Sequence, residues 1–345
     1  MSKVVHLPCY EENPYQGLLM AAQQELGWDV IDGGGGGNFL GVALRQWKPD
    51  VMHFHWLHPY LLRESWLGSI LRSARFLIEV ILLKLRGTRI GWTIHNLSNH
   101  DGRHAGLERF FTTLFAQMVD LPIAHSREAA CLASQEFHIP ENRILVTPHP
   151  GYCEYYPDTT SRDEARCRFG YAGDERVFLF LGRIQPYKGI FDLLEAFQEL
   201  PQHCRLLIAG TPADDETAER LKELVTRDPR IQFYPGHVSH EELQWFYRAA
   251  DVVVFPFRKI LTSGSVMLAM SFGKPLILPE GETLREAVGD GEAYWFLPGI
   301  TDSLKNQMIK IIHEDINLSG LKNYSIARSL KWNKMANAIS NYHNS

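Results

Sequence analysis

The sequence is poor in cysteine, has no excess of positive charge and contains no long apolar run. Lysine and arginine total 35 against 40 acidic residues, a formal net charge of -5, which excludes the basic surface of a dedicated nucleic-acid binder. A hydrophobic content of 45% excludes a disordered chain and supplies sizeable cores. The cysteines are too scattered for a metal knuckle or a redox pair, and their odd number argues against a disulfide framework: Cys9, Cys131, Cys153, Cys167 and Cys204.

Apolar residues never run for the roughly 20 positions that a membrane-spanning helix needs. No charged segment followed by an apolar stretch precedes the first strand pattern, which begins at Lys3, and we therefore predict no signal peptide. We expect a cytoplasmic protein, and we treat it as a monomer with no nucleic-acid partner.

The chain has 345 residues, more than twice the usual length of one domain, so two domains are expected. Short apolar runs of strand length alternate with helical patterns, as in parallel α/β sheets. We predict two Rossmann-like, doubly wound domains, spanning 1–155 and 160–321, that face each other across a ligand cleft. The predicted strands are Lys3–Leu7, Trp28–Ile31, Val51–Phe54, Arg89–Ile94, Leu121–Ala124 and Ile144–Thr147, then Val177–Leu181, Arg205–Ala209, Ile231–Tyr234, Val252–Phe255 and Pro275–Leu278.

Five consecutive glycines, Gly33–Gly37, suggest a phosphate-binding loop, but they lack the Lys-Ser/Thr of a P-loop and a clean Gly-x-Gly-x-x-Gly opening a helix. The alternative is a flexible turn before a helix that starts near Phe39. We favour the turn, because glycine alone specifies mobility rather than chemistry.

Two segments of the second half combine cations with helix starts. Gly182 and Arg183 follow a strand, and Lys188 stands at the opening of a helix over Ile190–Leu200, where the helix dipole and free N–H groups favour an anion. A second such segment ends in another helix start; it contains Arg258, Thr262, Ser263, Gly264 and Ser265. Cations and hydroxyls at one sheet edge predict a diphosphate site.

These motifs and their order resemble the donor-binding half of GT-B glycosyltransferases of family four. The residues that carry the resemblance are Gly182-Arg183, Lys188-Gly189, Ala209-Gly210, Gly236-His237-Val238, Ala250-Asp251-Val252 with Pro256, and Ala269-Met270 with Gly273-Lys274-Pro275; in the first half they are Asp50–His55 and Thr93–Asn96. The resemblance implies that a C-terminal helix, at about 322–345, returns to pack on the first domain.

The resemblance implies roles for several residues. Arg183 and Lys188 would bind the diphosphate of a nucleotide sugar, together with Gly182, Arg258 and the hydroxyl segment from Thr262 to Ser265. Many family members carry two glutamates before the Ala-Met pair; here Ile260 and Leu268 stand in their places, so hydroxyls would replace the lost carboxylates, with Glu280 and Glu282 as other candidates for sugar contacts. The base and ribose would meet Gly236, His237, Val238 and Val266.

Histidines are concentrated in the first half. By resemblance, His95 at a strand end would meet the transferred sugar, where a neutral imidazole can bond a hydroxyl. Acceptor contacts are predicted for Asn13, Tyr15 and Gln16, in a loop that precedes a helix. His53, His55 and His58 suggest a metal, but no carboxylate or cysteine completes a ligand set, and we predict no metal and no cofactor.

The stretch Tyr60–Arg86 mixes apolar residues with five cations and two anions. It fits an apolar face with basic residues on an anionic membrane, at the inner side, or a buried helix pair on the sheet.

We expect a hexosyltransferase of polysaccharide biosynthesis that acts on a saccharide or lipid-linked saccharide. The family implies retention of configuration. UDP-glucose is the first choice of donor, because the pattern also resembles cyanobacterial heterocyst-envelope polysaccharide glucosyltransferases, and GDP-mannose is the second. The alternatives are a nucleotide-sugar epimerase and a non-catalytic nucleotide-sugar-binding protein.

Overall fold

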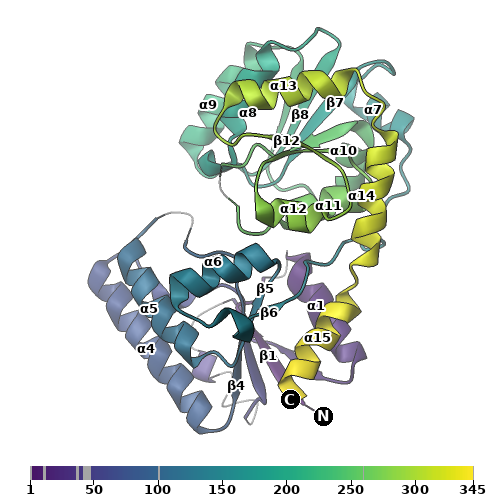
Figure 1. The fold of residues 1–345 in the computed structure, drawn as a ribbon. Coiled ribbons are helices and arrows are strands. Elements are labelled where there is room, and N and C mark those ends of the chain that lie inside the picture. The colour runs from purple at the N-terminus through teal and green to yellow at the C-terminus, as the bar shows by residue number, and fades with distance from the viewer. Residues whose placement is uncertain are drawn as a thin grey trace. The chain divides into compact units, whose positions relative to one another are not determined.

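A computed structural model describes residues 2–10, 13–35, 39–41, 48–99, 102–258 and 260–344. Gly36 and Gly37 of the glycine run, and Lys259, lie outside the described residues. The chain divides into two compact units, which are described separately: unit 1 comprises Met1–His149 with Lys331–Ser345, and unit 2 comprises Pro150–Leu330 (Figure 1).

Unit 1 is built on a six-stranded parallel sheet of order β2-β1-β3-β4-β5-β6. From β1 the chain adds β2 on one side and then β3 and the later strands on the other side. The position between β1 and β3 is therefore the topological switch point, where such sheets bind ligands. The strands are β1 (Lys3–Leu7), β2 (Asp29–Asp32), β3 (Val51–Phe54), β4 (Arg89–Thr93), β5 (Leu121–Ala124) and β6 (Leu145–Val146). The helices are α1 (Pro14–Glu25), α3 (His58–Leu61), α4 (Trp66–Leu85), α5 (Ala105–Met118), α6 (Arg127–Phe137), η1 (Glu141–Arg143) and α15 (Trp332–Asn344).

Helix α15 brings the end of the chain back to unit 1, where it packs along α1 (Figure 1). Tyr15 and Leu19 of α1 share a buried apolar cluster with Met335 and Ile339 of α15. Both helices place small and apolar residues on the facing stripe, which is how an amphipathic helix hides its apolar side. The first and last helices of the chain therefore stabilise the same sheet.

Unit 2 is also a six-stranded parallel sheet, of order β12-β11-β10-β7-β8-β9, with its switch point between β7 and β10. The strands are β7 (Arg176–Leu181), β8 (Cys204–Gly210), β9 (Ile231–Pro235), β10 (Val252–Val254), β11 (Leu276–Pro279) and β12 (Ala293–Phe296). The helices are α7 (Arg162–Phe169), η2 (Pro186–Lys188), α8 (Ile190–Gln198), α9 (Asp215–Thr226), α10 (Leu243–Ala249), α11 (Gly264–Ser271), α12 (Glu282–Val288), α13 (Thr301–Ile312) and α14 (Asn317–Ser329).

The predicted α/β class with two parallel sheets is confirmed. Two elements differ from the sequence prediction. Strand β12 was not predicted, and the single C-terminal helix is in fact two, α14 and α15. The break falls at Leu330, whose backbone is extended. Helix α14 stays in unit 2 because it lies close to α11, where Gly320 leaves room for the Gly273 carbonyl: a Cβ at Gly320 would come within 2.3 Å of that oxygen.

No helix of the described residues is long and apolar enough to cross a membrane.

Candidate functional site

The loops that follow β7 and β10 flank the switch point of the second sheet, and glycines let them approach closely. Gly182 has a φ of 142°, and a Cβ there would lie 3.6 Å from Ser265 Oγ and 3.9 Å from Lys188 Nζ. Gly189 has a φ of 72°, and a Cβ there would come within 1.9 Å of the Pro256 carbonyl oxygen. The sequence therefore brings Gly182, Lys188 and Ser265 together, as predicted for a shared anion site.

Lys188 and Arg183 form a pair of cations at this edge. Burial first, and then the charge of Arg183, lower the pKa of the Lys188 ammonium to about 8. Its Nζ lies 5.9 Å from the centroid of the Phe257 ring, and Arg183 is exposed. Neither cation forms an ion pair with a carboxylate of the described residues. A bound anion would supply the counter-charge that the protein leaves out.

The start of α11 supplies the other half of the site. Ser263 caps the helix, and its Oγ accepts a hydrogen bond from the Val266 N–H at 3.2 Å. Thr262, Gly264 and Ser265 are half-buried around this cap. The first-turn N–H groups and the helix dipole favour negative charge here. Capping of α11 thus explains the hydroxyl of Ser263 in this segment, and the helix start has the polarity that phosphate oxygens require.

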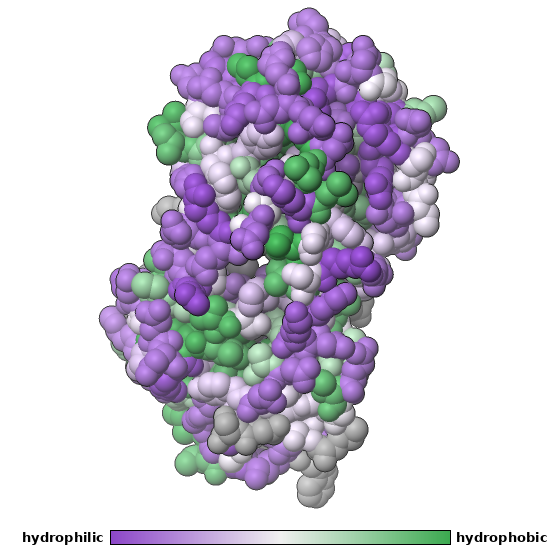
Figure 2. Space-filling view, turned by 45° about the vertical axis from the view of Figure 1, so that its right-hand side comes forward, coloured by the Kyte–Doolittle hydropathy of each residue, from purple (hydrophilic) through white to green (hydrophobic). Residues whose placement is uncertain are grey.

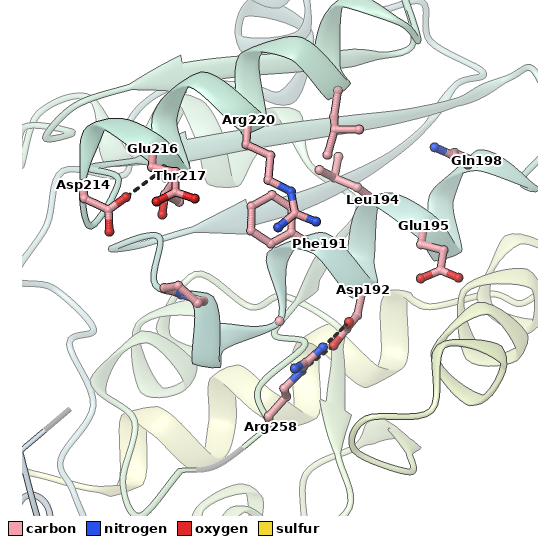
Figure 3. A pocket seen from close by; sticks show the side chains of 13 residues that line it. Phe191, Asp192, Leu194, Glu195, Gln198, Asp214, Glu216, Thr217, Arg220 and Arg258 are labelled. Atoms are coloured by element: carbon pink, nitrogen blue, oxygen red, sulfur yellow. Dashed lines mark hydrogen bonds and ion pairs between the residues drawn. The ribbon is translucent and has the colours of Figure 1, made fainter. Parts of the chain in front are cut away.

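Arg258 is placed differently from the sequence expectation. Its guanidinium forms a two-bond ion pair with Asp192 of α8, at 2.9 and 2.6 Å, so its charge is already balanced. Both residues line a pocket of about 590 Å³ in unit 2 that also reaches Gly189, and in it Arg220 stacks over Phe191 at 4.1 Å from its centroid (Figure 3). We therefore assign Arg183 and Lys188, and not Arg258, as the cations of the candidate diphosphate site.

The remaining donor-side residues occupy separate positions. Gly236, with a φ of 114°, follows β9 and donates its N–H to the Gly210 carbonyl at 3.1 Å, and His237 beside it is exposed while Val238 is half-buried. The Val266 side chain is fully buried, so only its backbone could face a nucleotide. Ile260 and Leu268, in place of the family glutamates, are half-buried, and Glu280 forms an ion pair with Arg285.

In unit 1, His95 follows β4 and is partly exposed. Its ring stacks on Trp56 with centroids 4.5 Å apart and receives the edge of Tyr15 at 4.9 Å. Burial, followed by His125 and His149, holds the pKa of His95 well below its usual value. The imidazole is therefore neutral near pH 7 and held in one orientation by aromatic neighbours.

The three residues predicted to contact an acceptor have roles inside the fold. Asn13 caps α1 by accepting the Tyr15 N–H at 3.1 Å. The Tyr15 hydroxyl is buried within 3.1 Å of His125 Nε2. Gln16 is buried and bridges the backbone of Pro8 and Tyr10. These contacts explain the residues without an acceptor, and we do not carry them into the functional proposal.

His53, His55 and His58 were weighed as metal ligands from the sequence, and no metal was predicted. His53 and His55 stack on each other with centroids 4.7 Å apart, and His58 begins α3. Among the residues that the structure describes, no group of three metal-binding side chains has the geometry for an ion. His6 was not among the predicted site residues, although histidines recur at the ends of successive predicted strands.

The family comparison matches residues 161–328 to the glycosyl transferases group 1 model. The chain is 25% identical over 254 residues to the GDP-mannose:glycolipid 4-beta-D-mannosyltransferase of Xanthomonas campestris pv. campestris, covering 72% of this chain and 67% of that protein. It is 33% identical over 251 residues to the D-inositol 3-phosphate glycosyltransferase of Mycobacterium bovis, covering 70% of this chain and 49% of that one. The matched segment contains every residue of the candidate donor site.

Solved structures resemble the fold over nearly the whole chain. Sucrose-phosphate synthase from Thermosynechococcus elongatus matches with a TM-score of 0.77 at 18% identity, over 100% of this chain and 98% of that one. Anabaena Alr3699/HepE in complex with UDP and glucose matches with a TM-score of 0.74 at 15% identity, over 99% of each chain. At these identities the likeness establishes the fold alone. Residues 161–328 are thus a glycosyl transferases group 1 domain, and the chain is a nucleotide-sugar-dependent hexosyltransferase with the GT-B fold.

Proposed function

We propose that this enzyme transfers a hexose from a nucleoside-diphosphate sugar, held by unit 2, to a lipid-linked saccharide in polysaccharide biosynthesis. The observation that carries the proposal is the pair of cations Arg183 and Lys188 beside Gly182 and Ser265, with no carboxylate of the described residues paired to either. Two uncompensated cations next to a helix N-terminus fit a diphosphate and fit few neutral ligands.

The chemistry follows from this charge. When the bond between the sugar carbon and the diphosphate oxygen breaks, negative charge grows on the leaving diphosphate, and preorganised cations stabilise that charge without reorganising. The acceptor oxygen forms the new bond to the sugar carbon, and its proton passes to the departing diphosphate oxygen. In this mechanism Arg183 and Lys188, rather than a metal ion, stabilise the leaving diphosphate. Retention of configuration rests on the family resemblance.

We propose UDP-glucose as the donor, with GDP-mannose as the second candidate. The UDP-and-glucose complex among the structures of similar fold is consistent with the first. The Xanthomonas relative, whose name specifies GDP-mannose and a glycolipid, favours the second and supports a lipid-linked acceptor.

We further propose that α4 and the adjacent α5 rest on an anionic membrane surface. Helix α4 buries one face, with Phe76, Val80 and Leu83, against unit 1, yet its outer face is apolar too. Leu67, Leu71 and Ile78 are 63%, 64% and 57% exposed; the other exposed apolar side chains are Trp66, Ile81, Leu82 and Leu85 on α4 and Phe110 and Leu114 on α5.

Hydrophobic side chains gather on the surface of unit 1 in the space-filling view (Figure 2). Arg63, Arg75 and Arg86 are exposed on or beside α4. An apolar helix face with exposed cations has the composition of a helix that lies in the interface of an anionic bilayer. Such a surface would hold the enzyme where a lipid-linked acceptor is found.

The experiment is a turnover assay with purified protein, UDP-glucose or GDP-mannose, and a lipid-linked saccharide in vesicles. Release of UDP or GDP that depends on the acceptor supports the proposal. His95→Ala should lower turnover while leaving UDP affinity unchanged, whereas Lys188→Ala should lower both. A protein that binds UDP tightly and releases none from any sugar nucleotide would favour the non-catalytic alternative.

A further inference from the structure

A histidine stands at the carboxyl end of five neighbouring strands of the first sheet. Their rings form a continuous row, with centroids 5.3 Å apart for His6 and His55, 5.5 Å for His55 and His95, 5.8 Å for His95 and His125, and 5.2 Å for His125 and His149. His6 and His55 are buried, and His95 is the partly exposed member next to them. The row connects the interior of unit 1 to the residue proposed to meet the sugar.

Three hydrogen bonds join part of this row end to end. The Gln23 Oε1 atom lies 2.7 Å from His6 Nε2. His6 Nδ1 lies 2.9 Å from His55 Nε2, and His55 Nδ1 lies 3.2 Å from His95 Nε2. Each ring between the ends uses both nitrogens, and a neutral imidazole has one donor and one acceptor nitrogen. All three bonds must therefore run in the same direction.

Gln23 sets that direction. Its Oε1 only accepts, so His6 carries its proton on Nε2 and accepts at Nδ1. His55 then donates from Nε2 to His6, and His95 donates from Nε2 to His55. This assignment requires neutral rings, and burial together with the neighbouring histidines holds the pKa values of His55 and His95 well below their usual range. His95 is left with an unprotonated Nδ1, for which the described residues provide no partner.

We propose that Gln23, His6 and His55 are positioning residues that fix His95 in the Nε2–H form, so that its Nδ1 accepts a hydrogen bond from a hydroxyl of the bound sugar. The inference rests on the proposed function for the identity of that hydroxyl, but the proton positions follow from the chain's own contacts. In any neutral imidazole, the hydrogen bond made by one ring nitrogen determines whether the other nitrogen carries the proton. A role as metal ligands is disfavoured, because both nitrogens of His6 and of His55 are already used.

His125 provides an internal contrast. Its Nδ1 lies 3.0 Å from the Thr147 carbonyl oxygen, which only accepts, and its Nε2 lies 3.1 Å from the Tyr15 hydroxyl. His125 must therefore carry its proton on Nδ1, the opposite of His95. Two histidines with adjacent rings are expected in opposite tautomers, which a merely packed row would not require.

The test is nitrogen NMR of the full protein with ¹⁵N-labelled histidine, assigned through single histidine substitutions. In the unsubstituted protein, His6, His55 and His95 should be protonated on Nε2 and His125 on Nδ1. Scalar couplings across the N–H···N bonds should join His6 to His55 and His55 to His95. A His95 ring protonated on Nδ1, or the absence of both couplings, would overturn the proposal without any assay of activity.

Variants then separate positioning from packing. Gln23→Leu removes the terminal acceptor, so His95 should become a mixture of both tautomers, and kcat should fall several-fold while KM for the donor changes little. His53→Leu is the matched control, because His53 is equally buried and stacks on His6 and His55 but hydrogen-bonds Thr93 at 2.8 Å instead of joining the row to His95. It should leave the His95 tautomer unchanged.

An unchanged tautomer in a folded Gln23→Leu protein would contradict the inference. If Gln23→Leu does not fold, the tautomers and couplings of the unsubstituted protein still decide. If the tautomers and couplings are as expected but the protein transfers no hexose, the proposed function is wrong and the proposed hydrogen bonds among the histidines are still supported.

Discussion

Arg183 and Lys188 are expected to contribute most of the charge that binds the diphosphate of UDP. Each should donate a charge-assisted bond to the diphosphate, worth roughly 1.5 to 3 kcal/mol, so Arg183→Ala and Lys188→Ala should each weaken UDP binding roughly 10- to 150-fold in calorimetric titrations. Arg220→Ala is the control, because Arg220 stacks on Phe191 and is not one of the cations proposed to bind the diphosphate, so its loss should leave the affinity unchanged. Unaltered UDP affinity in both site variants would remove the proposed diphosphate site.

The charge of Lys188 also depends on pH. The pKa of its ammonium is about 8, and a bound diphosphate must raise that pKa because it supplies opposite charge. The contribution of Lys188 to UDP binding is therefore complete below pH 8 and declines as pH rises through the higher pKa of the complex. Titrations in two buffers of different ionisation enthalpy should show proton uptake at pH 9 and little at pH 6. Lys188→Arg should abolish the uptake, and uptake that persists in this variant would assign it to another group.

At the scale of elements, the close approach of η2 to the loop after β10 depends on Gly189. Its φ is 72°, and a Cβ would meet the Pro256 carbonyl at 1.9 Å. Gly170, the C-cap of α7, has almost the same φ of 73° but open space around it. Gly170→Ala should cost only the left-handed strain of about 1–2 kcal/mol, while Gly189→Ala should cost more and also weaken UDP binding. Urea unfolding of both variants measures the difference, and equal losses would show that the close approach is unimportant.

The exposed apolar face of α4 is expected to bind membranes that contain anionic lipid. Replacing Leu71, Ile78 and Leu82 by Gln removes exposed apolar area without touching the buried face, so binding to vesicles that contain anionic lipid should be lost. The control replaces Leu318 and Leu321 of α14, which are 60% and 67% exposed, and should still bind. Sedimentation with the vesicles gives the result. If the α4 variant sediments like the unsubstituted protein, this face is not the membrane contact.

The sequence shows where most elements lie but defines their ends and partners poorly. The bounds of β1, β3 and β5 match the predicted runs, because continuous apolar segments between turn residues are typical of buried parallel strands. Strand β12 was missed because its residues Ala293–Tyr294–Trp295 are only half-buried at a sheet edge, so no buried run marks it. The pairing of Arg258 with Asp192 was also invisible, since 66 residues separate them.

At the scale of the whole molecule, ligand binding should be visible as stability. A nucleotide present at 100 times its Kd stabilises the folded protein by about 2.7 kcal/mol, which corresponds to roughly 5–10 °C in Tm for a domain of this size. In a thermal-shift panel of UDP, GDP, ADP and their sugars, UDP-glucose should give the largest increase, and GDP-mannose the next. A larger increase with GDP-mannose would reverse the order of the proposed donors. Lys188→Ala should reduce the increase for every nucleotide, because each would bind more weakly.

The candidate site was predictable in its second half and only partly in its first. Gly182, Lys188 and Ser265 stand at strand-to-helix transitions, which the sequence marks locally with glycine, cations and hydroxyls. The histidine row is not local, because His6, His55 and His95 come together only when β1, β3 and β4 lie side by side in that order. Their hydrogen bonds also need Gln23, which the helical pattern of α1 presents simply as one more polar residue.

The return of α15 to α1 has a consequence for synthesis on the ribosome. Unit 2 is encoded between the two parts of unit 1, so it can form its complete sheet while the last helix is still being made. Unit 1 cannot cover Tyr15 and Leu19 until Met335 and Ile339 have emerged. Domains usually fold in the order in which they are translated. Here the half of the enzyme that is translated first should be the half that is completed last.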